Sequence, residues 1–471
     1  MRINHNSLAL NASDHFATIN KNIQKSMARL SSGSKITSPE DDAAGLAIST
    51  KMSAQIRGLG RAAQNSNDGV SVIQSAEGGL NEIHSILSRM RELAVQAAND
   101  VNCEEDRDSI QEEIDSLRAE IDQITDTTAF NDQKLLNGDM SRRTMSTNFE
   151  VQVSYLSADV NPGEYQLTID AVGTQAKYQT ALSNSGATIT KEQAGTVVVN
   201  GFSVEIKEGM TMTDVYEALQ SHLHKIGIDV MASADGGVTE DTFASGSPVY
   251  FISQEYGKDI EIDIKVENPL LSAAIGIDDG INKTGTDCKA TLKATDGGFT
   301  ATSTMTTKGN EIMVIDRNGF EMKIDITDRA AGDVTLEVLT AGTMIVQTGA
   351  NSGEQLALDI PDLSSKALGL EHINMYTHDY ASAAISAIDE AVKMVSNVRS
   401  YLGANQNRLE DVYDNLKIQE ESITAAYSRI MDTDMAEEMT NYTQQDVLSQ
   451  AAISMIQKSN ERPESILQLL Q

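Results

Sequence analysis

Seven histidines are the side chains best suited to binding a metal or moving a proton, and they are scattered along the chain. Only His222 and His224 lie close together. Two residues apart on a predicted helix, they point to different faces and cannot hold one metal ion. The tract at Asp278 and Asp279 lacks the ligand spacing of a calcium loop. No His-Glu-x-x-His run, phosphate-binding glycine loop or Gly-x-Ser-x-Gly elbow occurs. The sequence therefore predicts a protein that is not an enzyme, with no catalytic residue, no metal and no cofactor.

The charge and the cysteines narrow the class of protein further. The net charge of −33 argues against binding nucleic acid or an anionic membrane, since both are polyanions. Cys103 and Cys288 lie in different regions and indicate free thiols rather than a disulfide framework. The sequence contains no run of 18 apolar residues, so it predicts no membrane-spanning helix. The first residues lack the apolar core of a cleavable signal peptide, so the chain either stays in the cytoplasm or leaves by another route.

The elements that must position any functional surface are long helices at both ends of the chain. Small or apolar residues recur in alternating steps of three and four, the period of a coiled-coil seam. The first such run is Ile73, Ala76, Leu80, Ile83, Leu87, Met90, Ala94, Ala97 and Val101. The last is Ile385, Ile388, Val392, Val395, Leu402, Leu409, Tyr413, Leu416, Ile423, Tyr427 and Ile430. Such helices pack either within one subunit, as a bundle, or between subunits.

A shorter helix is expected from about Ser13 to Leu30, with Ser13 as its N-cap. Its apolar face holds Phe16, Ile19, Ile23, Met27 and Leu30. A second helix should start near Pro39, run to about Asn99, and turn into a third that ends near Thr127.

The middle of the chain changes to the two-residue alternation of strands. Asn200-Gly201 and Asn318-Gly319 each separate two such strands and predict hairpin turns. The stretch 278–307, rich in Gly, Thr, Asp and Lys, is expected to be an exposed loop or domain seam. The fold class is thus α+β and multidomain, with long terminal helices forming coiled-coil or helical-bundle domains around an inserted β-rich region. The expected divisions are 1–44 and 45–147 (N-terminal helices), 148–332 (outer β region), 333–379 (β-hairpin return), 380–425 and 426–471 (C-terminal helices).

Several short motifs at both ends resemble those of bacterial flagellins. At the N-terminal end they are residues 30–36 (LSSGSKI), 41–48 (DDAAGLAI) and 91–96 (RELAVQ). At the C-terminal end they are residues 402–409 (LGANQNRL), 428–434 (SRIMDTD) and 466–471 (ILQLLQ). The order is that of the family, and the resemblance covers about half the chain.

The resemblance implies a structural subunit that is exported without a cleavable signal peptide and polymerises into the extracellular filament used for motility. It implies the chain itself, an export chaperone, the cap protein and the hook–filament junction protein as partners. The assembly helices would carry Phe16, Ile19, Ile23, Leu30, Leu416, Ile423 and Ile430. The alternatives are a hook–filament junction protein, or a flagellin whose insert is an enzyme or a ligand-binding module.

The resemblance also implies recognition by two host receptors of innate immunity. Toll-like receptor 5 would read a helical face that holds Arg89, Leu93 and Glu113. NAIP receptors would read the terminal leucines Leu467, Leu469 and Leu470. The same positions would serve first as assembly contacts.

Overall fold

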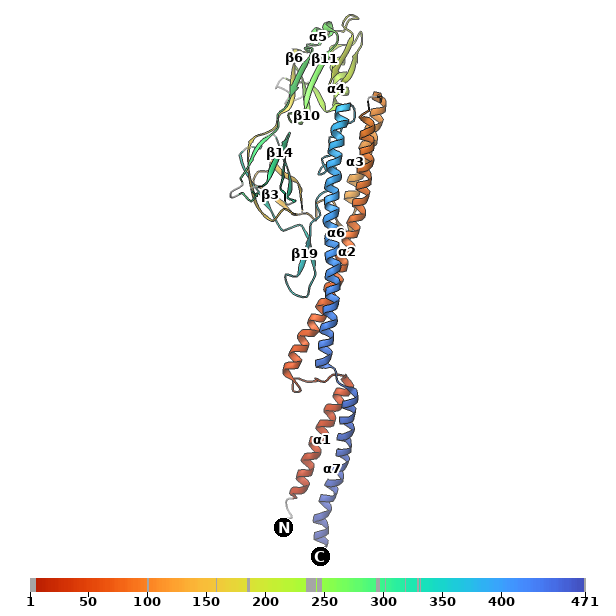
Figure 1. Cartoon of the computed structure of the whole chain (residues 1–471), viewed down its shortest axis with the longest axis vertical. Helices are drawn as coiled ribbons and strands as arrows, with labels where there is room; N and C mark the ends of the chain where they lie inside the picture. Colours follow the sequence, from red (N-terminus) through yellow and green to blue (C-terminus); the bar gives the residue numbers. More distant parts are fainter. Residues whose placement is uncertain are drawn as a thin grey trace. The chain divides into compact units, whose positions relative to one another are not determined.

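The computed structural model describes residues 6–469 except 100, 158, 184–186, 234–242, 244–247, 294–296, 301, 318, 328–329 and 331. The chain divides into two compact units. Unit 1 comprises residues 1–68, 347–355 and 409–471, and unit 2 comprises residues 69–346 and 356–408. The expected α+β class is confirmed, with long terminal helices and a β-rich middle (Figure 1). Among the described residues, no helix combines the length and apolar character needed to cross a bilayer.

The helices lie where the apolar periods place them, with small shifts at their ends. Their bounds are α1 Ser7–Ser32, α2 Ala43–Ala97, α3 Glu104–Thr127, α4 Met212–Leu223 with a 3-10 turn His224–Ile226, α5 Pro269–Ile275, α6 His378–Met431 and α7 Met435–Leu469. The expected start of the first helix at Ser13 was wrong. Asn6 caps α1, because its side-chain oxygen accepts a hydrogen bond from the Ala9 amide at 3.2 Å.

The helical core of unit 2 lies between α2, α3 and α6. The side chains of Ile73, Leu80, Ile83, Leu87 and Met90 on α2 are fully buried. Those of Ile114 and Ile121 on α3, and of Ile388, Val395 and Leu402 on α6, are at most 1% exposed. The intramolecular packing expected as one alternative is therefore found for this part of the seam. Val101, the last residue of the first run, is 86% exposed and lies beyond the packed region.

The strands form small antiparallel sheets. Their bounds are β1 Ala129–Phe130, β2 Gln133–Lys134, β3 Thr144–Ser146, β4 Val151–Leu156, β5 Gly163–Ala171, β6 Gln175–Ser183, β7 Gly195–Val199, β8 Phe202–Ile206, β9 Ile228–Ala232, β10 Pro248–Tyr256, β11 Glu261–Val266, β12 Ile281–Thr284, β13 Lys289–Leu292, β14 Thr304–Lys308, β15 Glu311–Ile315, β16 Glu321–Ile326, β17 Gly332–Val338, β18 Met344–Gln347 and β19 Gln355–Leu358. Of the two alternatives expected for 278–307, an exposed loop or a domain seam, the loop was wrong, since β12, β13 and the start of β14 lie there.

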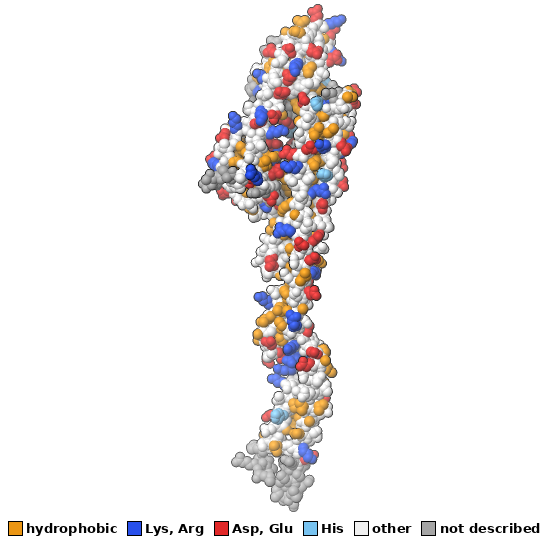
Figure 2. Space-filling model, in the orientation of Figure 1, with side chains coloured by type: hydrophobic (Ala, Val, Ile, Leu, Met, Phe, Trp, Pro, Cys, Tyr) orange, Lys and Arg blue, Asp and Glu red, His pale blue; other side chains and the backbone are white. Residues whose placement is uncertain are grey.

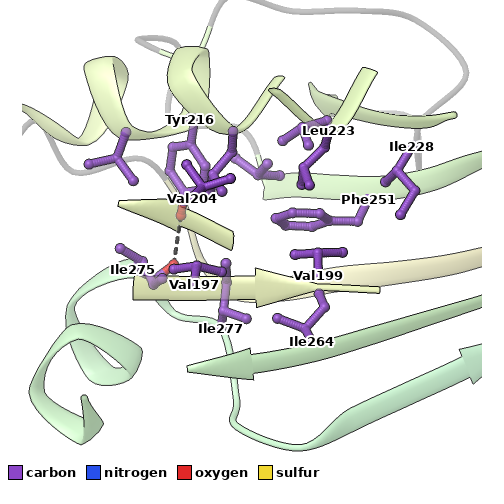
Figure 3. Packing of buried hydrophobic residues seen from close by; sticks show 14 of the residues in the cluster. Val197, Val199, Val204, Tyr216, Leu223, Ile228, Phe251, Ile264, Ile275 and Ile277 are labelled. Atoms are coloured by element: carbon purple, nitrogen blue, oxygen red, sulfur yellow. Dashed lines mark hydrogen bonds between the residues drawn. The ribbon is translucent and has the colours of Figure 1, made fainter. Parts of the chain in front are cut away.

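Two β modules share unit 2. The first is a sandwich of two four-stranded sheets, β13-β5-β17-β3 and β14-β15-β16-β4, around a common core. The second holds the sheets β6-β10-β9 and β12-β11-β7-β8 with α4 and α5. In its core, Phe251 lies against Val199 and the Tyr216 hydroxyl donates to the Ile275 carbonyl at 2.6 Å (Figure 3).

The second module is closed where it leaves the sandwich. Thr174 and Thr286 exchange backbone hydrogen bonds of 2.8 and 3.1 Å, and their hydroxyls are 2.8 Å apart. The hairpin expected at Asn200-Gly201 is confirmed, with φ of 48° and 78° at the two turn residues between β7 and β8. The second expected turn residue Asn318 lies outside the described residues, although β15 and β16 pair as expected.

Candidate assembly surface

The helices α1 and α7 of unit 1 lie side by side along much of their length (Figure 1). The Asn6 amide donates to the Ser459 carbonyl at 3.0 Å near one end of the pair, and Arg29 lies 3.8 Å from Glu438 near the other. The charges of the two helices are complementary. α1 carries three basic residues and one acidic residue, whereas α7 carries five acidic and two basic residues. Opposite charge therefore favours this pairing.

The seam between α1 and α7 is not a closed core. The expected seam residues Phe16, Ile19, Ile23 and Leu30 are all half-buried. The buried residues of the two helices within the described side chains are Ser26, Glu438 and Ser449, which are polar. Two helices that bury no large apolar side chain between them gain little hydrophobic free energy. The pair therefore needs further surfaces to cover its apolar residues.

Large apolar side chains also lie exposed on both helices, and Figure 2 shows hydrophobic side chains at the surface of unit 1. They are Leu8, Leu10 and Met27 on α1, and Met435, Met439, Val447, Leu448, Ile453 and Met455 on α7. Successive residues of a helix are turned by about 100° about its axis. Met435, Met439 and Ile453 therefore fall on one flank of the seam with α1. Leu448 and Met455 fall on the other flank. An apolar surface on both flanks suits a helix that packs against more than one neighbour.

The turn between α1 and α2 is held by Asp41, a role that the sequence did not reveal. The Asp41 carboxylate accepts hydrogen bonds from the amides and hydroxyls of Thr37 and Ser38, at 3.0 to 3.3 Å. Lys25 and Arg29 of α1 lie 3.5 and 3.8 Å from its oxygen atoms. The hydrogen bonds from Thr37, above all, lower the pKa of Asp41 to about 2. The only indication of this role in the sequence is Thr37, a hydroxyl residue four positions before Asp41.

This turn also joins both ends of the chain within unit 1. The Lys35 amide donates to the Met431 carbonyl at 2.5 Å, and the Thr433 amide donates to the Gly33 carbonyl at 3.0 Å. Gly33 ends α1 with a φ of 69°, a conformation that favours glycine. The short link between α6 and α7 is thereby fixed to the turn that Asp41 holds.

We expect Asp41→Asn to destabilise unit 1 at neutral pH. Because the folded state lowers the pKa of this carboxyl from 3.8, its stabilisation is complete above pH 4 and is lost as the pH falls towards 2. The loss at pH 7 should be about 1 kcal/mol, because the partly exposed Lys25 and Arg29 are screened by solvent. Urea unfolding at pH 7 and at pH 2.5, followed by circular dichroism, measures it. The difference between the two proteins should be clearly smaller at pH 2.5 than at pH 7, because the stabilisation disappears only as the pH falls through the folded-state pKa of about 2. An equal difference at both pH values would contradict the role of this carboxylate.

Leu416 lies in a small intramolecular core of unit 1. It is 5% exposed and packs in a cluster with Leu59, Ala62 and Ala63 of α2. Ala350 also contacts this cluster. A Cβ atom added at Gly58 would lie 3.0 Å from the Cβ atom of Ala350. Leu416 therefore packs first inside the subunit. The other two expected positions of α6, Ile423 and Ile430, are half-buried.

The residues expected to be recognised by host receptors differ in their exposure to solvent. Arg89 and Glu113 form an exposed ion pair on α2 and α3 at 2.8 Å, and Glu92 lies 3.3 Å from the same guanidinium. Leu93, however, is only 2% exposed and belongs to the helical core. The expectation that these residues share one surface is thus corrected for Leu93. Of the terminal leucines, 467 and 469 lie on α7 without described side chains, and Leu470 lies outside the described residues.

No group of three or more His, Cys, Asp or Glu in the described part of the chain is placed to hold a metal ion. His222 and His224 are both exposed, and the second contacts Asp229 at 2.7 Å through its Nδ1 atom. Cys103 is exposed and Cys288 is buried, both as free thiols. The surface feature that stands out is therefore the uncovered apolar face of α1 and α7.

Comparison with known proteins gives matches at both ends of the chain. Residues 3–141 match the model of the bacterial flagellin N-terminal helical region. Residues 385–470 match the model of the bacterial flagellin C-terminal helical region. The segments that build the α1–α7 pair and the helical core thus lie almost entirely inside the matched ranges.

Relatives that match along almost the whole chain are named flagellin. The chain is 32% identical to a flagellin of Clostridium tyrobutyricum over 463 residues, covering 98% of this chain and 100% of that one. It is 30% identical to a flagellin of Salmonella rubislaw over 509 residues, covering 99% of each. Among solved structures, a flagellar hook-associated protein of Legionella pneumophila is similar at 14% identity and a TM-score of 0.31, covering 81% of this chain and 98% of that one.

Proposed function

The chain belongs to the bacterial flagellin family, the structural subunits of the flagellar filament, and we propose that its polymer contacts are made by the uncovered faces of α1 and α7. The observation that carries this proposal is the half-buried seam. Phe16, Ile19 and Ile23 gain only part of their burial from α7 within one subunit. Packing against neighbouring copies would remove the remaining apolar area from water, at about 25 cal/mol per Å².

The geometry favours contacts with several copies rather than a closed dimer. The exposed apolar side chains of α7 lie on both flanks of its seam, so one partner cannot cover them all. Contacts of this kind between unlike faces generate a helical polymer when the rotation between copies does not close into a ring. Leu416, Ile423 and Ile430 would support the polymer by holding the start of α2 and the end of α6 together.

We expect Val447→Asp to prevent filament growth without unfolding the subunit. Val447 on α7 is 59% exposed, so the monomer tolerates a carboxylate there. In the polymer the same charge would enter a desolvated contact, at a cost of several kcal/mol, and raise the critical concentration by at least about 100-fold. Seeded polymerisation followed by sedimentation and negative-stain microscopy measures the critical concentration.

Val447→Asn is the matched control for this experiment. Asparagine has nearly the shape of aspartate and carries no charge, so it separates the effect of the charge from the loss of the valine methyl groups. The control should still grow filaments, with a critical concentration much closer to that of the wild type. Equal critical concentrations for the two variants would contradict an assembly contact at Val447.

The partners of this flagellin remain part of the proposal. We propose that the chain is exported without a cleavable signal peptide, with the help of an export chaperone, and polymerises between the hook–filament junction protein and the cap protein. The whole-length relatives named flagellin favour the filament subunit over the alternative, a junction protein. In the described part of the insert, no group of three or more His, Cys, Asp or Glu is placed to hold a metal ion.

Recognition by host receptors is proposed from the family resemblance. Toll-like receptor 5 would meet the exposed Arg89–Glu113 pair, whose guanidinium and carboxylate are each about half-exposed. The Leu93 side chain would support this surface from below rather than contact the receptor. NAIP receptors would read Leu467, Leu469 and Leu470.

A further inference from the structure

One sheet of the β-sandwich in unit 2 has a polar face that is shielded from solvent. In β16, Met322, Ile324 and Ile326 point into the sandwich core, so the alternating residues Glu321, Lys323 and Asp325 point to the opposite face. That face would be solvated on an ordinary outer sheet. Here Lys323 is 7% exposed, and its neighbour across the strands, Tyr155 of β4, is 4% exposed.

Segments of unit 2 that follow β19 cover this face. A Cβ atom added at Gly369 would lie 3.4 Å from the Lys323 ammonium nitrogen. Lys366, from the same segment, interacts with the charge of Asp325. Lys393 and Glu390 of α6 interact with the charge of Glu321. Charged side chains thus lie in the contact that the β-sandwich makes with α6 and residues 366–369.

The positive charge on this face of the sheet compensates its carboxylates only in part. Lys323 forms an ion pair with Glu311 of β15 at 3.0 Å, and Glu311 lies directly opposite Asp325 in the sheet. Asp325 is left with a buried Oδ1 atom that has no hydrogen-bond partner among the described residues. The Ser154 hydroxyl of β4, which donates to the Lys323 carbonyl at 3.4 Å, also lowers the pKa of this carboxyl. A buried carboxylate without full compensation favours its neutral form.

The titration of both carboxyl groups follows from this arrangement. Burial raises the pKa of Asp325, and the neighbouring Glu311 adds to the rise, against Lys323 and Lys366. Burial likewise raises the pKa of Glu321, with Glu390 adding to the rise and Lys393 opposing it. The lysines on both sides of the contact therefore compensate the carboxylates only in part.

We propose that this polar face is a proton-controlled contact between the β-sandwich and α6 with its preceding segment. Proton uptake by Asp325 and Glu321 tightens the contact, and proton release loosens it. The folded state holds these protons more strongly than the unfolded chain, whose pKa values are 3.8 for Asp325 and 4.5 for Glu321. The stabilisation is therefore complete at a pH below these unfolded-state pKa values. It is lost as the pH rises through the raised pKa values of the folded state. The acid response of this contact is opposite to that of the Asp41 turn.

Amide hydrogen exchange of the monomeric full-length protein tests the proposal. Protection factors, which already correct for the pH dependence of chemical exchange, are measured by mass spectrometry for peptides covering β4 and β16 at pH 5 and pH 8. We expect several-fold higher protection at pH 5. Asp325→Asn combined with Glu321→Gln mimics the protonated pair and should raise the protection at pH 8 above that of the wild type at the same pH.

Asp333→Asn on β17 is the matched control within the same sandwich. The Asp333 side chain is 68% exposed and pairs with Lys293 at 2.8 Å, and the pKa of this carboxyl is lowered rather than raised. This variant should keep the wild-type difference between pH 5 and pH 8. If the double variant does not fold, Asp325→Asn alone serves for the same comparison. Wild-type protection that does not change with pH, or a neutral variant that loses protection at both pH values, would overturn the proposal.

Discussion

Deletion of residues 1–30 is expected to abolish filament formation and leave both β modules folded. It removes nearly all of α1, so α7 loses the helix that covers Tyr442, Ser449 and Ile456 on one face. It also removes the half-buried Phe16, Ile19, Ile23 and Leu30. Their lost burial amounts to more than about 3 kcal/mol per subunit, which corresponds to at least about a 100-fold rise in critical concentration. Negative-stain microscopy after seeding measures the outcome, and near-ultraviolet circular dichroism reports whether the β modules remain folded.

A larger deletion elsewhere provides the control. Removal of residues 175–285 takes out the second β module, which Thr174 and Thr286 close with two backbone hydrogen bonds. Because its own core is separate from the sandwich core, we expect the remaining chain to fold and to form filaments. Long filaments from the 1–30 deletion, or none from the larger one, would contradict the assignment of assembly to α1 and α7.

The helical parts could be predicted because their signal is local. The run from Ile73 to Ala97 repeats in steps of three and four, and the structure buries it completely at Leu80, Ile83 and Leu87. Periodicity does not identify the partner, however. It left open whether Leu416 packs within the subunit or against another, and only the fold brings this residue to Leu59.

The parts that sequence reasoning missed depend on contacts between distant residues. The stretch 278–307 was expected to be an exposed loop or a domain seam because it is rich in Gly, Thr, Asp and Lys. Its strands are short, and β12 exposes three of its four residues at the edge of a sheet. Asp325 and Asp359 lie in the fold against Lys366 and Arg142, which follow or precede them by many residues. No spacing in the sequence reports such a burial.

Leu416→Asp is expected to unfold the Leu416 core of unit 1 and, as a consequence, to suppress assembly. The substitution places a carboxylate where the native side chain is 5% exposed and packs against Leu59, Ala62 and Ala63. Loss of the packed leucine and burial of an unpaired charge together cost about 4 kcal/mol or more. Urea unfolding measured by helical circular dichroism should show an early transition for unit 1, and seeded growth should fail.

Gln419→Asp adds the same charge three residues further along α6, at an exposed position, and should unfold and assemble like the wild type. The comparison separates two origins of the assembly defect. If Leu416→Asp lowers both stability and assembly, the native leucine acts by fixing α6 to α2 inside the subunit, and the polymer depends on that rigidity. If the variant unfolds at the wild-type urea concentration and still fails to assemble, Leu416 makes its decisive contact with a neighbouring subunit, and the intramolecular role argued from its burial is wrong.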